Sequence, residues 1–315
     1  MNCFLNDQKG VDKLRRQEQI RRNTEGDGAM SGYRDRLGGK TWIAAHRGIA
    51  GGNIPCNSIA GYEASILQGA DVLEVDISIS LDGTLYVFHP KKEPLFLRSQ
   101  KFIPQMHDEE IDALELVNSD GARSGEHVPR LDACLERFGS RCVLNVDKFW
   151  TDIPRIAAAI RRCGMQDQVI VKAPLKPEYL RQIEEYAPDM PFMPLIREDD
   201  GTHETLLANP RIRYIGAEVL FKEDTSPLAS RAFIDRVHRD GCVLWVNPII
   251  YDPKEQLVAG RSDDRAITGD PDGSWGWLIE RGFDILQTDW PLAMRLYGMA
   301  KYLQRFDALE RYQKK

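Results

Sequence analysis

Three acidic residues follow short apolar runs of this 315-residue chain and are the first candidates for chemistry. Glu74 and Asp76 are two positions apart, so in a strand both side chains point to one face. Asp147 ends a second run. Inward-facing carboxylates each cost on the order of several kcal/mol in lost hydration unless their charge is compensated. Because oxygen ligands suit a hard divalent cation, we predict that Glu74, Asp76 and Asp147 bind one Mg²⁺ or Ca²⁺.

Other polar residues occupy comparable positions, and the alternative to a functional site is a set of structural ion pairs. The acidic pair could simply bind Arg47 or Lys148, and alternation along a strand places Lys148 on the face opposite Asp147. Lys172 ends an apolar run and is the better candidate for an inward cation. So many polar residues on consecutive strand ends favour a functional cluster. The predicted substrate contacts are Arg47, Asn57, Lys148, Lys172 and Trp245.

The elements that must position these residues alternate regularly from residue 41 onward. Short runs rich in β-branched residues are separated by helix-length segments, a pattern that predicts βα units and a parallel sheet. Eight runs, with no glycine-rich loop after the first, predict a (β/α)8 barrel of the TIM type, whose active sites lie at the C-terminal strand ends. The predicted strands are residues 41–46, 71–77, 142–147, 169–173, 191–196, 214–219, 242–247 and 284–289.

A ninth run, residues 84–89, follows the second barrel strand too closely for a helical crossover. Asp82 and Gly83 between the two runs predict a hairpin with a two-residue turn. That register places His89 directly opposite Asp76, with Cβ atoms about 4.5–5.5 Å apart. We therefore expect a hairpin at the barrel rim that brings a histidine beside a carboxylate.

Composition and charge limit the class of protein and its partners. The chain has 42 Lys and Arg against 48 Asp and Glu, and this mild acidity argues against a nucleic-acid partner. No stretch approaches the roughly 18 apolar residues of a membrane span, and the N-terminus lacks the apolar core of a signal peptide. The six cysteines form no metal-binding pattern and suit a reducing compartment. We expect a cytoplasmic protein that acts on a small molecule.

We place the barrel domain at residues 41–315. Two segments are expected to be additions to the barrel fold, one before this domain and one inserted within it. Residues 1–40 are rich in Arg, Asp and Gly and predict a charged arm or helix, which is also a candidate contact with a second subunit. Residues 90–141 are a long interruption after the second strand. We predict a small insertion or lid that shapes the pocket.

Residues 44–90, AAHRGIAGGNIPCNSIAGYEASILQGADVLEVDISISLDGTLYVFHP, closely resemble the glycerophosphodiester phosphodiesterase family. The family shows a His-Arg-Gly start, a Pro-Glu-Asn-Thr-like segment, a Leu-Glu-x-Asp strand, an Asp-Gly turn and a second histidine. The resemblance continues through VPRLDACL, LNVDK, VLWVN and DILQTDWP. It implies a phosphatidylinositol-phospholipase-C-like barrel and metal-dependent hydrolysis of glycerophosphodiesters to glycerol phosphate and an alcohol. It also implies that His46 and His89 are the general acid/base pair, Glu74, Asp76 and Asp147 the metal ligands, and Arg47 the phosphate ligand.

The chain departs from the family pattern at three places, which indicates a divergent member. Cys56 replaces an acidic residue, Pro90 follows the second histidine, and Asp147 is one carbon shorter than the family's glutamate. The family's lysine at position 149 is a phenylalanine, and Lys172 could replace it from the next strand. Two alternatives stay open, namely lyase-like or phospholipase cleavage of lysolipid head groups, and a barrel that binds a phosphorylated ligand without turnover. The nucleophile, water or a substrate hydroxyl, also stays open.

Overall fold

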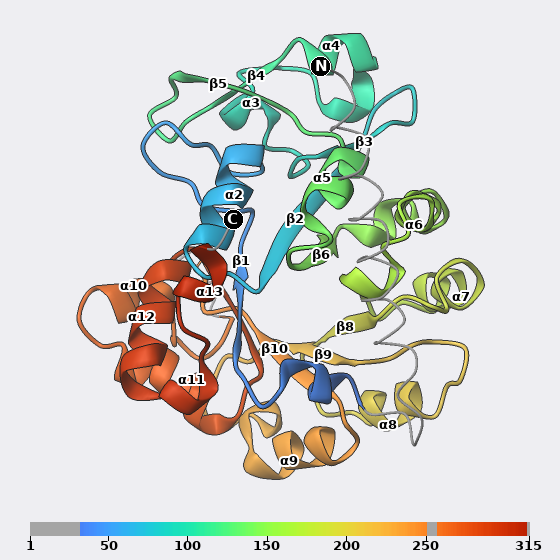
Figure 1. The fold of residues 1–315 in the computed structure, drawn as a ribbon. Coiled ribbons are helices and arrows are strands. Elements are labelled where there is room, and N and C mark those ends of the chain that lie inside the picture. Colours follow the sequence, from blue (N-terminus) through green and yellow to red (C-terminus); the bar gives the residue numbers. More distant parts are fainter. Residues whose placement is uncertain (1–31, 251–256, 314–315) are drawn as a thin grey trace, which may run out of the picture. The chain divides into compact units, whose positions relative to one another are not determined.

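The computed structural model describes residues 32–250 and 257–313, of which residues 33–313 lie in one compact unit. Most of the expected N-terminal arm therefore lies outside the described residues. Eight parallel strands form a closed barrel with helices on its outside (Figure 1). The sheet closes because β1 pairs with both β2 and β11. In order around the barrel the strands are β1 (Trp42–Ala45), β2 (Val72–Ile79), β6 (Val143–Asp147), β7 (Val169–Pro174), β8 (Phe192–Ile196), β9 (Gly216–Val219), β10 (Val243–Val246) and β11 (Ile285–Thr288). The predicted TIM barrel is confirmed.

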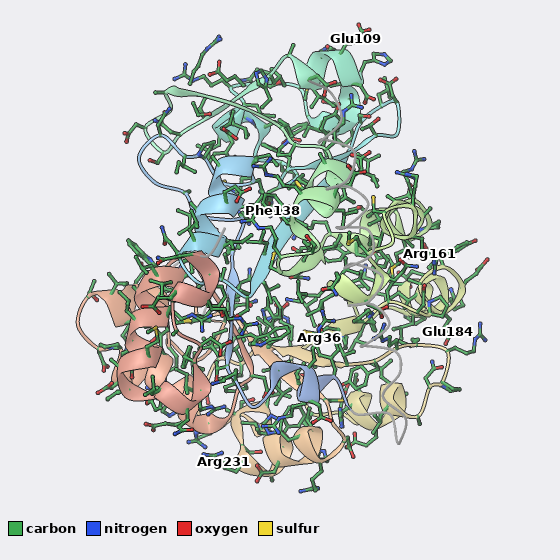
Figure 2. The ribbon with its side chains drawn as sticks, in the orientation of Figure 1. Arg36, Glu109, Phe138, Arg161, Glu184 and Arg231 are labelled. Carbon is green, nitrogen blue, oxygen red and sulfur yellow. The ribbon has the colours of Figure 1, made fainter. Side chains whose placement is uncertain are left out.

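The longer outer helices have an apolar face toward the strands and a polar face outward. In α6 the Asp152 side chain accepts the Arg155 N–H at 3.0 Å, which caps the first turn. Ile156 and Ile160 are buried, whereas Arg161 lies on the outer surface (Figure 2). None of the described helices is long and apolar enough to cross a membrane. The outer helices are α2 (Ile59–Leu67), α5 (Leu131–Phe138), α6 (Ile153–Arg162), α7 (Pro177–Tyr186), α8 (Thr202–Leu207), α9 (Arg231–Arg239), α10 (Asp263–Ile267), α11 (Trp277–Arg281), α12 (Pro291–Lys301) and α13 (Glu310–Gln313).

Apolar side chains fill the barrel interior beneath the C-terminal strand ends. Val72, Val143 and Ile170 pack there with Trp245, and Leu37 from the 3-10 helix Tyr33–Leu37 joins this cluster. Burial of this layer excludes water from the N-terminal half of the barrel. Polar residues along the strands are therefore concentrated at the other end, where the site lies.

The rim hairpin forms as predicted, but its register differs by one residue. β3 (Leu85–Val87) pairs antiparallel with β2, with Ile79 opposite Leu85 rather than Tyr86. The turn holds three residues instead of two, because Gly83 takes a left-handed φ of 88° after a tight turn. Since β3 ends at Val87, His89 leaves the ladder, and the shift does not turn its side chain away from the pocket.

Residues 90–141 build a small layer over the hairpin. It contains α3 (Glu93–Phe96), α4 (Asp108–Asp112) and an antiparallel pair, β4 (Glu115–Val117) and β5 (Arg123–His127), and it leads into α5. Its apolar residues, among them Ile103 and Ile111, form their own cluster with Tyr86 and Phe88 of the hairpin arm. This small core anchors the insertion to the barrel rim, where Lys92 reaches the pocket.

Candidate active site

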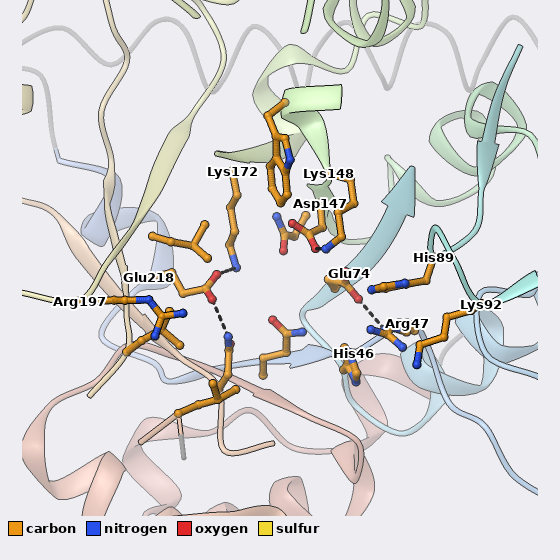
Figure 3. Close-up of a pocket in the computed structure, with 17 residues that line it drawn as sticks. His46, Arg47, Glu74, His89, Lys92, Asp147, Lys148, Lys172, Arg197 and Glu218 are labelled. Carbon is orange, nitrogen blue, oxygen red and sulfur yellow. Dashed lines mark hydrogen bonds and ion pairs between the residues drawn. The ribbon is translucent and has the colours of Figure 1, made fainter. Parts of the chain in front are cut away.

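A pocket of about 430 Å³ opens at the C-terminal ends of the strands (Figure 3). It is formed by residues from β2, β6, β7, β8, β9 and β11, and by loops that follow the barrel strands, including the one after β1. Parallel strands direct their C-terminal ends to one rim, so residues far apart in sequence meet there. Of the residues singled out in the sequence, the pocket is lined by His46, Arg47, Glu74, His89, Asp147, Lys148 and Lys172.

The three predicted metal ligands converge. Glu74, Asp76 and Asp147 each offer an oxygen atom, and these atoms lie within 4.8 Å of one another. The parallel register explains this, because Asp76 of β2 pairs directly with Asp147 of β6. Burial, followed by the charges of Asp76 and Asp147, raises the pKa of the Glu74 carboxyl well above its usual range.

Two cations compensate part of this negative charge. Arg47 Nε lies 3.1 Å from Asp76 Oδ2, and Lys148 pairs with Asp147 and lies 3.7 Å from Asp76 Oδ1. Burial opposes ionisation of Asp147, but Lys148 outweighs it and lowers the pKa of this carboxyl. Within the described ranges no donor forms a hydrogen bond with the buried Asp76 Oδ1. That oxygen and the raised pKa of Glu74 indicate that Arg47 and Lys148 do not fully compensate the negative charge of the three carboxylates. All of the potential ligand atoms are oxygens, which fits a divalent cation.

Lys148 faces the pocket although strand alternation predicts the opposite face. β6 ends at Asp147, and Lys148 takes a left-handed φ of 58°, which redirects its side chain toward the carboxylates. Phe149, at the family's lysine position, is fully buried in the core. Lys172 does reach the pocket from β7, but it binds Glu218 at 2.7 Å rather than any of the three clustered acids.

The two histidines are held through Nδ1 by different partners. His46 Nδ1 lies 2.7 Å from Asp289 Oδ1, and His89 Nδ1 lies 2.8 Å from the Pro90 carbonyl oxygen. A carbonyl only accepts, so His89 carries its proton on Nδ1 when neutral, and Nε2 is the ring atom on the side of Asp76, at 3.9 Å. Burial lowers the pKa of His89; Arg47 and Lys148 add to this effect, and Asp76 opposes it.

Asn57 and Trp245 are not among the residues that line the pocket, and their role as substrate contacts stays a prediction. Asn57 is buried, donates to Asp76 Oδ2 at 3.1 Å and accepts the Tyr62 hydroxyl at 2.7 Å. Trp245 is fully buried and donates Nε1–H to Asn247 at 2.7 Å. Both therefore position other polar residues from behind the pocket wall.

The structure adds residues that the sequence prediction left out of the site. Asp289 holds His46, and the buried Asp263 in turn accepts the Asp289 N–H at 2.9 Å and the Thr288 hydroxyl at 2.8 Å. Asp289 follows the last strand, a position at which this fold places active-site residues. Asp263 begins α10, and no sequence spacing connects it to His46. Burial raises the pKa of Asp263 to about 7.

Comparison with known proteins places this site in a recognised fold. A sequence-family model described as a domain of unknown function matches residues 192–297. A glycerophosphodiester phosphodiesterase of Caldanaerobacter subterraneus is 27% identical over 159 residues, 48% of this chain and 65% of that protein. The chain thus spans less than two thirds of the length of that relative.

Solved structures cover more of the chain. A glycerophosphoryl diester phosphodiesterase from Parabacteroides distasonis superposes with a TM-score of 0.68 at 18% identity, over 86% of this chain and 92% of that one. An Oleispira antarctica phosphodiesterase in complex with the product sn-glycerol-3-phosphate gives 0.59 at 16% identity, over 81% and 95%. Fold and pocket are those of a TIM barrel with its polar site at the C-terminal rim. The predicted resemblance to glycerophosphodiester phosphodiesterases is confirmed by the named relatives in sequence and in fold.

Proposed function

We propose that this protein hydrolyses glycerophosphodiesters to glycerol phosphate and an alcohol. One observation carries the proposal: two histidines, an arginine and three converging carboxylates line or border one pocket at the barrel rim. Phosphodiester cleavage needs charge neutralised on the phosphoryl oxygens, a proton removed from the nucleophile and a proton given to the leaving alkoxide. These residue types meet the three needs, and the named relatives support this reaction class.

The histidines, the arginine and the carboxylates would have separate roles in phosphodiester hydrolysis. Glu74, Asp76 and Asp147 would hold a divalent cation, which supplies Lewis-acid stabilisation of the phosphoryl oxygens. Arg47 would bind the phosphate beside it. His89 would accept the proton of the attacking water or substrate hydroxyl on Nε2, because its lowered pKa keeps the ring neutral near pH 7. His46, oriented by Asp289, would then donate a proton to the leaving oxygen.

The direct test uses the purified full chain with glycerophosphoglycerol and lysophosphatidylglycerol, each with Mg²⁺, with Ca²⁺ and with EDTA. We expect glycerol phosphate from the deacylated diester with either cation and a rate near background in EDTA. Phosphorus NMR separates glycerol phosphate from a cyclic phosphate, which would indicate the lyase reaction. Cleavage of the lysolipid alone, or ligand binding without any product, would contradict the proposal.

The pH profile of kcat/KM is expected to show an acidic limb below the usual histidine range. His89 must be neutral to act as the base, so activity falls as the pH drops through its lowered pKa. Lys148→Met removes a cation that lowers this pKa, and its acidic limb should therefore move to higher pH. Initial rates between pH 4 and 9 measure both limbs. An unshifted acidic limb in Lys148→Met would argue against His89 as the group that titrates.

Arg47→Lys should lower kcat/KM by about 10²-fold, within the range measured when one transition-state donor is removed. Lysine keeps the charge but loses the planar, two-pronged donor geometry that fits phosphate. Residue 47 has a left-handed φ of 54°, and this conformation costs about the same free energy for arginine as for lysine. Arg162→Lys on the exposed face of α6 is the matched control. Activity of Arg47→Lys within about twofold of wild type would remove Arg47 from phosphate binding.

A further inference from the structure

The pocket extends well past the proposed reaction centre. Around the barrel β8 is the fifth strand and β9 the sixth, so they lie across from β1 and β2. Arg197 directly follows β8, and Glu218 lies on β9. Figure 3 shows Arg197, Glu218 and Lys172 on the opposite side of Glu74 from His89. A phosphodiester bound at the centre has two substituents, and the pocket has room for one of them to extend toward this far end.

The one carboxylate among the far-end lining residues is already engaged. Glu218 accepts Lys172 Nζ at 2.7 Å and Asn247 Nδ2 at 2.6 Å, and Lys172 Nζ lies 3.3 Å from the centre of the Trp245 ring. Both Glu218 and Lys172 are buried. A cationic group on the substrate would therefore have to compete with Lys172 for Glu218. This end of the pocket is poorly suited to choline-like groups.

Arg197 is the cation at this end that other residues leave available. In the part of the chain that the structure describes, no carboxylate forms an ion pair with Arg197. The acidic residues that follow it do not line the pocket, and Asp199 binds Arg236 at 2.5 Å instead. Leu195, Leu220 and Leu257 form apolar parts of the lining, and Arg197 itself is exposed, so its guanidinium is accessible to a ligand.

The charge of the whole lining favours an additional anion. Together with Asp76, which borders the pocket, the lining carboxylates Glu74, Asp147 and Glu218 make four negative groups that face five cations. Arg47 and Lys148 bind the acidic cluster, and Lys172 binds Glu218. The positive charge that remains lies on Lys92 at the histidine end and Arg197 at the far end. A phosphodiester supplies a single negative charge, which the reaction centre itself would bind.

We propose that Arg197 binds a second anionic group, a carboxylate or a phosphate, on the alcohol portion of the substrate. The inference rests on the proposed phosphodiesterase activity and narrows its substrate class. Guanidinium groups match the geometry of both anions through paired donors. The preferred substrates are then glycerophosphodiesters whose alcohol is acidic, and diesters with neutral or cationic alcohols are turned over less efficiently.

Two matched substrate pairs test this inference with the full chain. Glycerophosphoserine differs from glycerophosphoethanolamine by one carboxylate, and glycerophosphoinositol phosphate differs from glycerophosphoinositol by one phosphate. We expect kcat/KM to favour the acidic member of at least one pair by about 10-fold, which equals about 1.4 kcal/mol. The pair that shows the preference identifies the anion. Arg197→Gln should reduce this ratio to less than about threefold, and Arg197→Glu should invert it.

Controls separate Arg197 from general electrostatics. Arg162→Gln, on the outer face of α6, removes the same charge and should preserve the ratio. Lys92→Gln should change the ratio less than Arg197→Gln. The inference is overturned if wild type shows no preference in either pair, if Arg197→Gln retains the ratio, or if Lys92→Gln alone removes it. Absence of turnover on all four diesters would instead overturn the proposed activity, and the inference with it.

Discussion

Replacement of His89 by alanine is expected to lower kcat/KM for a glycerophosphodiester by about 10²–10⁴-fold, the range for loss of a general base. His89 Nδ1 donates to the Pro90 carbonyl at 2.8 Å, which leaves Nε2 to accept the proton. The ring is partly exposed at the pocket wall, so its removal opens no large cavity in the core. Steady-state rates and the thermal unfolding midpoint should show a loss of activity in a protein that remains folded.

His46→Ala should cause a comparable loss, and the leaving group of the substrate distinguishes the two roles. A p-nitrophenyl diester needs no proton on its leaving oxygen, so it should restore much of the rate of His46→Ala but not of His89→Ala. His46→Gln is a useful second variant because an amide retains a hydrogen bond to Asp289 without acid catalysis. Equal recovery in both alanine variants, or normal turnover of natural diesters, would contradict the assignment.

The barrel was predictable because local and long-range signals agree along this chain. The apolar run of residues 142–147 has no polar position except Asn145 before Asp147, as expected of a strand buried on both faces. The convergence of Glu74 and Asp147 followed from the fold alone, since adjacent parallel strands end at one rim. These features depend on residue type and spacing, which a single sequence contains.

Other features depend on backbone conformation and could not be derived from spacing. The hairpin register is set by the left-handed φ of Gly83, which adds a residue to the turn. Lys148 reaches the acidic cluster through its own left-handed φ, against strand alternation. Asp263 contributes through a contact between α10 and the end of β11, which is purely tertiary. The position of Trp245 beneath Lys172 likewise depends on the packing of the barrel interior.

Glu74→Gln is expected to abolish the stabilisation of the protein by divalent cations and to lower kcat/KM by about 10³-fold, equivalent to several kcal/mol of lost transition-state stabilisation. A ligand that binds the folded state raises the unfolding midpoint, so Mg²⁺ or Ca²⁺ should stabilise wild type and not Glu74→Gln. In wild type the backbone N–H of Arg47 donates to Glu74 Oε2 at 2.8 Å, and the glutamine amide of the variant keeps an oxygen that can accept this hydrogen bond. The loss is therefore one of charge and not of shape.

In EDTA, without a divalent cation, Glu74→Gln is not expected to lower the unfolding temperature. This expectation distinguishes loss of the metal site from misfolding of the variant. Because the folded-state pKa of Glu74 is raised, the stability linked to its protonation is present at low pH and is lost as the pH rises through that pKa. At pH 7 without a cation, Glu74→Gln should therefore unfold at the same or a higher temperature than wild type. Asp147→Glu keeps the charge and should retain the cation response, whereas Asp147→Asn should weaken it. Cation-induced stabilisation that survives in both Glu74→Gln and Asp147→Asn would exclude this cluster as the metal site, because a cation bound elsewhere would be independent of both carboxylates.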